Sequence, residues 1–376
     1  MKRFLIAAVL VVLLVFLSVR IFPSCVSDNH DSVFTSEKLL TARADDLQST
    51  GITPHLDAPI EPGCSVLWCA TFQLAWNEVC TLVGEDIHFD DETSMVAILN
   101  RKSATKADLD EASYVALAGF VRDGIYDEIP KALERKFKGA ARPRLLPDPA
   151  VAPRPQDIVA YAYLFKNLEF PTPFERLDEP LDFGGKRVDC FGIGREYKPD
   201  HPRLYPQVRI LYYEGPDDFA VELLTKSPKD RLILAKRRPA ATLLQTVTAT
   251  EERIAASEPA NAVTGDVLIV PKFNFDLTRS YDELIGRSLV VKNPAVAKDL
   301  VLLAAIQNIR FQMDEKGVRL RSESHMQFGC AAPEHPQPEH LMIFDKPFMV
   351  VLKREGAKAP YFALWVDNSE LLVPCD

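Results

Sequence analysis

The chain has 376 residues, of which 47% are hydrophobic and 26% charged, and its formal net charge is −9. This composition is typical of an ordinary folded protein and excludes a disordered tail, a collagen-like fibre and a multi-pass membrane protein. The acidic balance also argues against a nucleic-acid-binding protein, which needs a basic stripe to displace counterions. The length fits two or three domains, or one large domain.

The N-terminus has the pattern of an export signal. A basic start is followed by an apolar run from Phe4 to Val19. This run is long for a cleaved signal and short for a membrane span of about 20 residues. Residues 1–24 are therefore predicted to be an export signal or a membrane anchor, and Cys25 is a candidate lipidation site. In either case we expect an exported protein that is extracellular, periplasmic or anchored to a membrane facing outside.

The cysteines fit an oxidising compartment, but seven are too sparse for a scaffold built from disulfides. If Cys25 is lipidated or removed, six remain, and six cysteines allow 15 pairings among which the sequence does not choose. Buried free thiols are an equally open alternative. In both cases a hydrophobic core must hold the fold. The other six are Cys64, Cys69, Cys80, Cys190, Cys330 and Cys375.

The first half of the chain is predicted to be mainly helical. Residues 25–59 are polar and irregular, and we expect a linker there with one short helix near 37–47. Helical patterns follow over 66–83, 107–121 and 126–137. The proline-rich stretch 138–156 is expected to form a covering loop or connection.

The second half is predicted to be mainly strands. Short helices are expected at 281–285 and 294–303, between runs rich in β-branched and aromatic residues. Helices followed by mostly strands predict an α+β fold. The predicted strands cover 158–165, 208–213, 219–224, 231–234, 267–275, 306–313 and 348–352.

No group of residues has the pattern of a catalytic, metal or cofactor site. Cys64 and Cys69 flank Trp68 in a way that is superficially similar to a cysteine protease nucleophile. The flanking residues do not match, however, and no downstream histidine has a convincing partner context. The histidines lack ligand spacing on a common element, and no glycine-rich phosphate loop is present. We therefore expect no enzymatic activity, no metal and no cofactor.

The segment from Ile306 to Phe348 is unusual. A predicted strand runs into Asp-Glu-Lys-Gly at 314–317, and a long stretch without an element of its own follows. Such a loop in a compact domain is functional or disordered. From Gly317 onward the residues alternate, as one buried and one solvated strand face require. An exposed hairpin edge would have the same pattern. One face carries Val318, Leu320, Ser322 and Ser324, and the other carries Arg319, Arg321, Glu323 and His325.

The order of several segments resembles the serpin family of protease inhibitors. Asp-Glu-Lys-Gly, a long loop and the Phe-Asp-Lys-Pro-Phe of 344–348 match the surroundings of the family's reactive loop. The likeness covers residues 160–370 well and 60–135 loosely. Further matching segments are Tyr161 to Lys166 with Pro173-Phe174 (third central-sheet strand), Val270 to Phe273 with Tyr281 to Gly286 (strand and following helix), and Pro360 to Asn368 (closing strand).

The resemblance implies a divergent serpin of an exported, bacterial type. Its fold would be α+β, with helices packed on a large mixed central sheet, smaller antiparallel sheets and an exposed loop that is similar to a reactive centre. Residues 60–376 would form a single domain behind the linker, with residues 317–343 as the loop. The protein would act as a monomer.

In the family, a serine protease cleaves the loop, and the loop then inserts into the central sheet and traps the protease. The resemblance therefore implies a serpin-like inhibitor of serine-type endopeptidases outside the cytoplasm. Small residues at the cleavage site would suit an elastase-like protease. The hinge would comprise Glu315, Gly317, Val318, Leu320 and Ser322, and the scissile-bond candidates are Cys330, Ala331 and Ala332.

The chain also departs from the family's pattern. The family's hinge has threonine and then alanines, whereas residues 318–321 here are Val-Arg-Leu-Arg. Long or charged side chains slow insertion, and a slow inserter is cleaved as a substrate. Phe170 stands where the family has tryptophan, and Leu364 where its closing strand has glycine. A non-inhibitory binding or structural protein on a serpin fold is therefore the open alternative.

Overall fold

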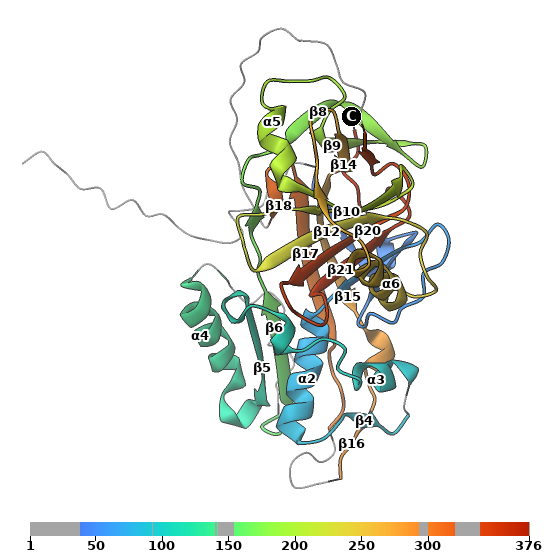
Figure 1. The fold of residues 1–376 in the computed structure, drawn as a ribbon. Coiled ribbons are helices and arrows are strands. Elements are labelled where there is room, and N and C mark those ends of the chain that lie inside the picture. The colour runs from blue at the N-terminus through green and yellow to red at the C-terminus, as the bar shows by residue number, and fades with distance from the viewer. Residues whose placement is uncertain are drawn as a thin grey trace, which may run out of the picture.

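The computed structural model describes residues 38–91, 93–139, 141, 154–292, 300–319 and 339–375. Within them the chain forms three larger sheets, two sheets of two strands each, and several helices (Figure 1). This arrangement confirms the α+β prediction. No helix in these ranges combines the length and the apolar content that a bilayer crossing requires.

The five-stranded sheet carries the segment that the sequence singles out. Its order is β1-β15-β17-β18-β7, with β1 parallel to β15 and the other neighbours antiparallel. Alternate residues point inward, and Phe275 and Phe311 are buried there. On the outer face, Asn308 donates to Asp276 at 2.7 Å. The strands are β1 (Leu40–Arg43), β7 (Leu168–Glu169), β15 (Phe273–Ser280), β17 (Ile306–Asp314) and β18 (Gly317–Arg319).

The eight-stranded sheet packs against this inner face and contains the centre of the core. The rings of Phe311 and Phe362 stack with centroids 4.6 Å apart and planes inclined by 9°. The order is β13-β10-β11-β12-β20-β21-β3-β2. These strands are β2 (Thr50–Thr53), β3 (Ser65–Cys69), β10 (Val208–Gly215), β11 (Asp218–Leu223), β12 (Asp230–Lys236), β13 (Ala260–Asn261), β20 (Phe348–Arg354) and β21 (Phe362–Val366).

The four-stranded sheet lies at the upper end of the molecule in Figure 1. Its order is β19-β14-β9-β8, and β19 is parallel to β14. The strand β19 follows the long loop, so the loop leaves the five-stranded sheet and returns to this one. The strands are β8 (Glu175–Phe183), β9 (Lys186–Ile193), β14 (Val267–Pro271) and β19 (Leu341–Ile343).

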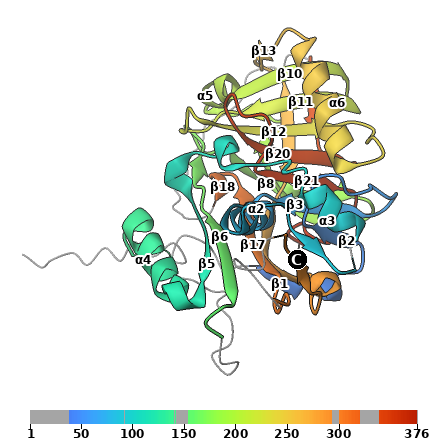
Figure 2. The same ribbon diagram turned by 90° about the horizontal axis from the view of Figure 1, so that it is seen from below.

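A separate unit is built from β5 (Tyr114–Phe120), β6 (Ile158–Leu164) and α4 (Ile125–Phe137). The two strands pair only with each other in the described residues. One face of the pair forms a small apolar cluster with α4, to which Ile129 and Leu133 contribute. Helix α2 (Thr71–Val83) contacts both strands and separates them from the eight-stranded sheet, as the view in Figure 2 shows.

The remaining elements are short connections apart from α6, which contacts β10 at one side of the eight-stranded sheet (Figure 2). They are η2 (Ala44–Asp46), β4 (His88–Phe89), α3 (Ser94–Leu99), η3 (Lys106–Asp108), η4 (Glu111–Ser113), η5 (Val121–Asp123), α5 (His201–Leu204), η6 (Tyr205–Gln207), α6 (Leu243–Ala255), η7 (Asp282–Leu284) and β16 (Leu289–Val290).

Several helix predictions are wrong. Over 107–121 the chain forms β5, because Tyr114 to Phe120 pairs along its whole length with β6, and tertiary pairing overrides a weak helical pattern. The helix predicted near 37–47 is instead β1 followed by η2, inside the stretch expected as a linker. The helix predicted from 66 begins at Thr71, because the preceding residues form β3.

Other predicted elements are confirmed or fall outside the described residues. Helix α4 and the predicted strands are present, with the 267–275 run divided into β14 and β15. Helix α6 is not among the predicted elements; its N-cap Thr242 accepts a hydrogen bond from the Gln245 amide. Most of the proline-rich stretch 138–156 and residues 293–299 lie outside the described residues.

Candidate functional site

The predicted hinge begins inside the five-stranded sheet. Strand β18 lies between β17 and β7 and pairs with both, so Val318 stands opposite Met313 on one side and Leu168 on the other. The Val318 side chain is 2% exposed. The first residues of the predicted loop are therefore already a middle strand of this sheet.

Gly317 is required by the closeness of β7. Its φ of +154° is unfavourable for residues with a side chain. A Cβ atom here would lie 2.5 Å from the carbonyl oxygen of Leu168 and 2.9 Å from the Cα of Glu169, both of them backbone atoms. Only glycine therefore lets β18 enter between its neighbours without displacing them.

Glu315 fastens the turn before β18. Its carboxylate forms an ion pair and a hydrogen bond with Lys272, and its carbonyl accepts from the Phe174 amide at 2.7 Å. Burial acts to raise the pKa of Glu315, but the nearby Lys272 ammonium outweighs it, and the pKa lies below its ordinary value. The turn is thus bonded to both the β14–β15 connection and the segment after β7.

An aromatic cluster of Phe170, Phe174 and Phe191 lies next to this turn. Phe170 and Phe174 meet edge to face with centroids 4.8 Å apart, and both lie near Phe191 of β9. The Phe170 amide donates to the Lys316 carbonyl at 3.0 Å. Phe170, which stands where the resemblance expects tryptophan, is therefore an apolar support for the turn.

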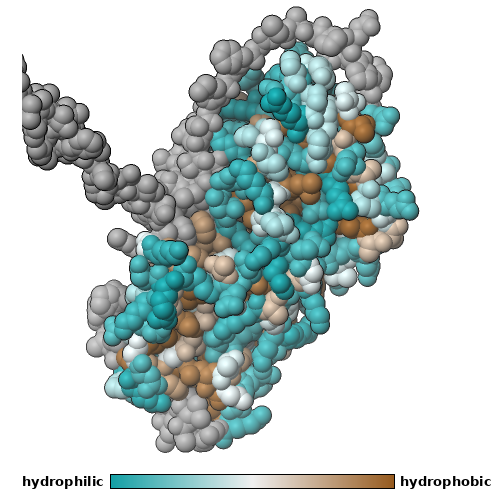
Figure 3. Space-filling view, turned by 60° about the vertical axis from the view of Figure 1, so that its left-hand side comes forward, coloured by the Kyte–Doolittle hydropathy of each residue, from teal (hydrophilic) through white to brown (hydrophobic). Residues whose placement is uncertain are grey.

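Next to the rest of β17 the described residues place no strand on the side of β18. The β17 ladder to β18 covers Gln312 to Asp314, whereas its ladder to β15 extends back to Ile306. Strand β6, which precedes β7 in the chain, pairs with β5 and not with β17. All β6 residues except Tyr161 are only half-buried. Figure 3 brings this side forward and shows hydrophobic surface among polar residues.

A buried polar cluster holds the connection between β6 and β7. The Lys166 ammonium lies 2.7 Å from Asp230 Oδ1, and their side chains are 8% and 4% exposed. Tyr361 donates to the same oxygen at 3.0 Å, and Ser227 donates to the other at 2.7 Å. Burial and the Asp230 carboxylate raise the pKa of Tyr361. This cluster ties the β6–β7 connection to the eight-stranded sheet.

Lys166 and Lys272 are site residues that the sequence does not predict. Both occur within segments that carry the family resemblance, but a lysine in a predicted strand is by itself typical of a solvated edge. Their long-range partners, Asp230 and Glu315, are what make them buried ion pairs. Only the fold brings these partners together.

Not every predicted site residue can be placed. Leu320, Ser322, Cys330, Ala331 and Ala332 lie outside the described residues. Glu315, Gly317 and Val318 are brought together at the five-stranded sheet, and the chain is described again from Glu339, before β19. The sheet thus holds the start of the predicted loop, and the four-stranded sheet holds its end.

Among the described residues, the cysteines and histidines form no catalytic or metal-binding cluster. No disulfide joins Cys64, Cys69, Cys80, Cys190 and Cys375. Burial raises the pKa of the Cys69 thiol, which disfavours a reactive thiolate. His201 pairs with Glu175 at 2.8 Å and His340 with Asp266 at 3.0 Å. In the described ranges no three ligand side chains are placed to hold a metal ion.

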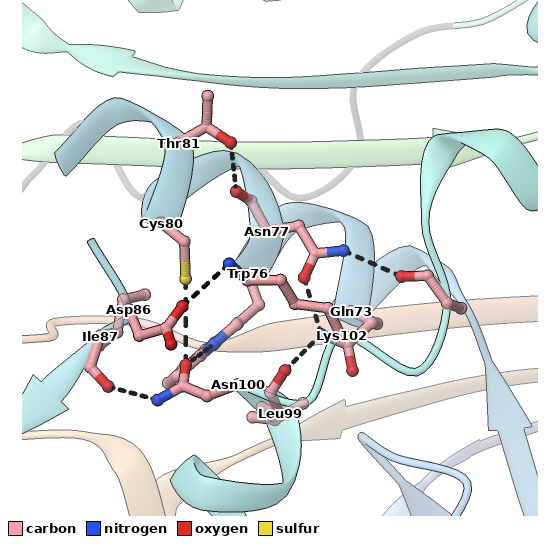
Figure 4. Close-up of polar contacts among 11 residues, drawn as sticks. Gln73, Trp76, Asn77, Cys80, Thr81, Asp86, Ile87, Leu99, Asn100 and Lys102 are labelled. Carbon is pink, nitrogen blue, oxygen red and sulfur yellow. Dashed lines mark hydrogen bonds and ion pairs between the residues drawn. The ribbon is translucent and has the colours of Figure 1, made fainter. Parts of the chain in front are cut away.

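Figure 4 shows a polar network that joins α2 to Ile87 and to Asn100, the residue that follows α3. The Asn100 side-chain oxygen accepts from the Trp76 indole at 2.9 Å, and its amide donates to the Ile87 carbonyl at 2.8 Å. The Cys80 thiol lies 4.0 Å from the same oxygen. Cys80 is thus part of a structural network between α2 and the residues around Asn100.

No protein-family model matches the sequence, and comparison with curated proteins finds no similar sequence. Solved structures with a similar course of the chain include Serpin48, a highly specific serpin of the insect Tenebrio molitor. It is 14% identical, with a TM-score of 0.45 over 82% of this chain and 92% of that one.

Two further structures are similar in the same way. Thyroxine-binding globulin, solved with thyroxine, is 14% identical, with a TM-score of 0.41 over 79% of this chain and 89% of that one. A serpin from Schistosoma mansoni is 12% identical, with a TM-score of 0.36 over 64% of this chain and 62% of that one.

Proposed function

We propose that the protein is a serpin-like inhibitor of serine-type endopeptidases, which works through cleavage of its loop and insertion of the cleaved segment into the five-stranded sheet. The observation that carries the proposal is the position of β18. Gly317 and Val318 are paired on both sides, and Val318 is buried between β17 and β7. An ordinary exposed hairpin edge would leave one side of this strand unpaired.

Continued insertion fits the surroundings of β18. Val318 pairs with Met313, which is buried. A strand that continued past β18 would turn Leu320, Ser322 and Ser324 toward the same inward face. From Phe311 back to Ile306, the described residues place no strand on the side of β17 that β18 occupies, and β6 is half-buried. Each added residue would pair its backbone with these strands, which supports a free-energy gain from insertion.

The bait for the protease would be Cys330 to Ala332. The small side chains of Ala331 and Ala332 suit the shallow pocket of an elastase-like protease, and the same segment would be a poor substrate for a trypsin-like one. The hinge residues Val318-Arg319-Leu320-Arg321 support the second candidate, a non-inhibitory serpin-fold protein, because long side chains slow insertion. The two candidates differ in whether the cleaved protein retains the protease as a covalent adduct.

The deciding experiment incubates the purified protein with an elastase-like and a trypsin-like serine protease. We expect a covalent adduct with the elastase-like protease that survives a denaturing gel, together with loss of protease activity. The Val318→Arg variant should be cleaved without adduct, since a charge cannot enter the buried position. The control Val263→Arg changes a side chain that is 45% exposed and should behave like the wild type. Cleavage of the wild type without adduct would favour the non-inhibitory protein.

We further infer that the protein works as a monomer outside the cytoplasm, after export through residues 1–24. The apolar run after a basic start and the cysteine content support export. Mass spectrometry of the protein from its own cells should identify either a new N-terminus near residue 25, a lipid on Cys25 or an uncleaved anchor. Recovery of the unprocessed protein from the cytoplasm would contradict export.

A further inference from the structure

His340 is fixed where the chain returns to the fold. Its amide donates to Asp266 Oδ1 at 2.9 Å, and its carbonyl accepts from the Val267 amide at 3.0 Å. The imidazole Nδ1 lies 3.0 Å from each carboxylate oxygen of Asp266. The ring also meets Tyr213 edge to face, with centroids 4.8 Å apart, and the Tyr213 hydroxyl accepts from the Leu341 amide at 3.2 Å.

The Asp266 carboxylate depends on this histidine for a positive partner. Its side chain is 0% exposed, whereas that of His340 is 26% exposed. The Val263 amide also donates to it at 2.9 Å, and among the described residues its ion-pair partner is His340. A buried carboxylate is costly unless a positive group or several donors compensate for lost hydration.

In the described part of the chain, the other titratable groups around the pair carry no positive charge. Tyr213 of β10 faces the ring, and Tyr205 of η6 accepts from the Gly265 amide at 3.1 Å, next to Asp266. Glu339 precedes His340 and is exposed. The charge of the imidazole therefore decides whether Asp266 has an ion pair or only hydrogen bonds.

We propose that His340 and Asp266 form a protonation-sensitive clamp that fastens β19, and with it the C-terminal end of the loop, to β14. Imidazole is the side chain best suited to such a switch, because the protonated ring of His340 completes the ion pair with Asp266 and the neutral ring removes it. Strand β19 is suited to such control, because it is a three-residue edge strand held by a single neighbouring strand in the described residues. The clamp requires no protease, so it stands or falls separately from the proposed function.

The test is amide hydrogen exchange at pH 5.5 and 8.0, with each rate corrected for the intrinsic pH dependence of exchange. We expect the amides of β19 to open roughly three- to tenfold more often at pH 8.0 than at pH 5.5, because loss of the ion pair weakens the attachment of β19. The His340→Gln variant should lose this difference while the β9 amides remain unchanged.

Two further variants make the outcome decisive. Asp266→Asn keeps the imidazole but removes the carboxylate charge, and it should also abolish the pH difference. His88→Gln changes a histidine of β4, in another sheet, and should retain it. A pH difference that persists in both His340→Gln and Asp266→Asn, or that is absent from the wild type, overturns the proposal.

Discussion

At position 317, a single methyl group would lie 2.5 Å from the Leu168 carbonyl oxygen. We therefore expect Gly317→Ala to expel β18 and to lower the free energy of unfolding by about 1–3 kcal/mol through backbone strain. Hydrogen exchange of β7 and thermal unfolding measure these effects. Gly51→Ala is a matched control in β2, since the nearest atom to its Cβ lies 4.0 Å away. Equal effects of the two substitutions would contradict a special role of Gly317.

The ion pair of Glu315 and Lys272 predicts an acid-sensitive hinge. The pKa of folded Glu315 lies below its ordinary value of 4.5, so its contribution is complete above that pH and disappears as the pH falls through the lower, folded pKa. Glu315→Gln should cost about 1–3 kcal/mol at pH 7. Unfolding of the wild type and the variant in urea from pH 7 to pH 3 should show the difference shrinking in acid. A difference independent of pH would show that the charge contributes nothing.

Among the elements, α2 depends on the half-buried side chain of Asn100, which follows α3. Asn100→Ala would leave the Trp76 indole and the Ile87 carbonyl without the partners they have now. We expect a loss of about 2–4 kcal/mol, since each buried polar group left unpaired costs about 1–3 kcal/mol. Chemical unfolding followed by tryptophan fluorescence measures it. Thr81→Ala, which removes one exposed hydrogen bond on the same helix, should change stability by less than about 1 kcal/mol.

The strands beside β18 predict what cleavage of the loop does to stability. If the cleaved segment extends β18 along β17, the protein nicked between residues 320 and 338 should melt roughly 10 °C or more above the intact protein. Each kcal/mol raises the melting temperature of a large domain by about 2–4 °C. Calorimetry of intact and nicked wild type measures the shift, and nicked Val318→Arg serves as the control. An unchanged or lower melting temperature of the nicked wild type would show that no strand is added.

For the whole molecule, the sequence is most informative where a pattern is local. Strand residues such as Val208 to Tyr213 alternate or are β-branched, and they form strands as predicted. Tyr114 to Phe120 has no such local signal, because its conformation depends on pairing with a strand that lies 38 or more residues later. Equally, Gly317 and Glu315 were identified from a motif, whereas Lys272 and Lys166 became site residues only through partners distant in the sequence.

The N-terminal strands have a consequence for how the molecule can change shape. Strand β1 adds to the outer edge of the five-stranded sheet, and β2 adds to the edge of the eight-stranded one. The carboxylate of Glu370 accepts from the Gln48 and Ser49 amides between them. These strands and their connection hold the five-stranded and eight-stranded sheets together along one edge. If the five-stranded sheet gains a strand, its β1 edge stays in place and its opposite edge must move. We expect β5, β6 and α4 to shift together at that edge, across the surface of α2.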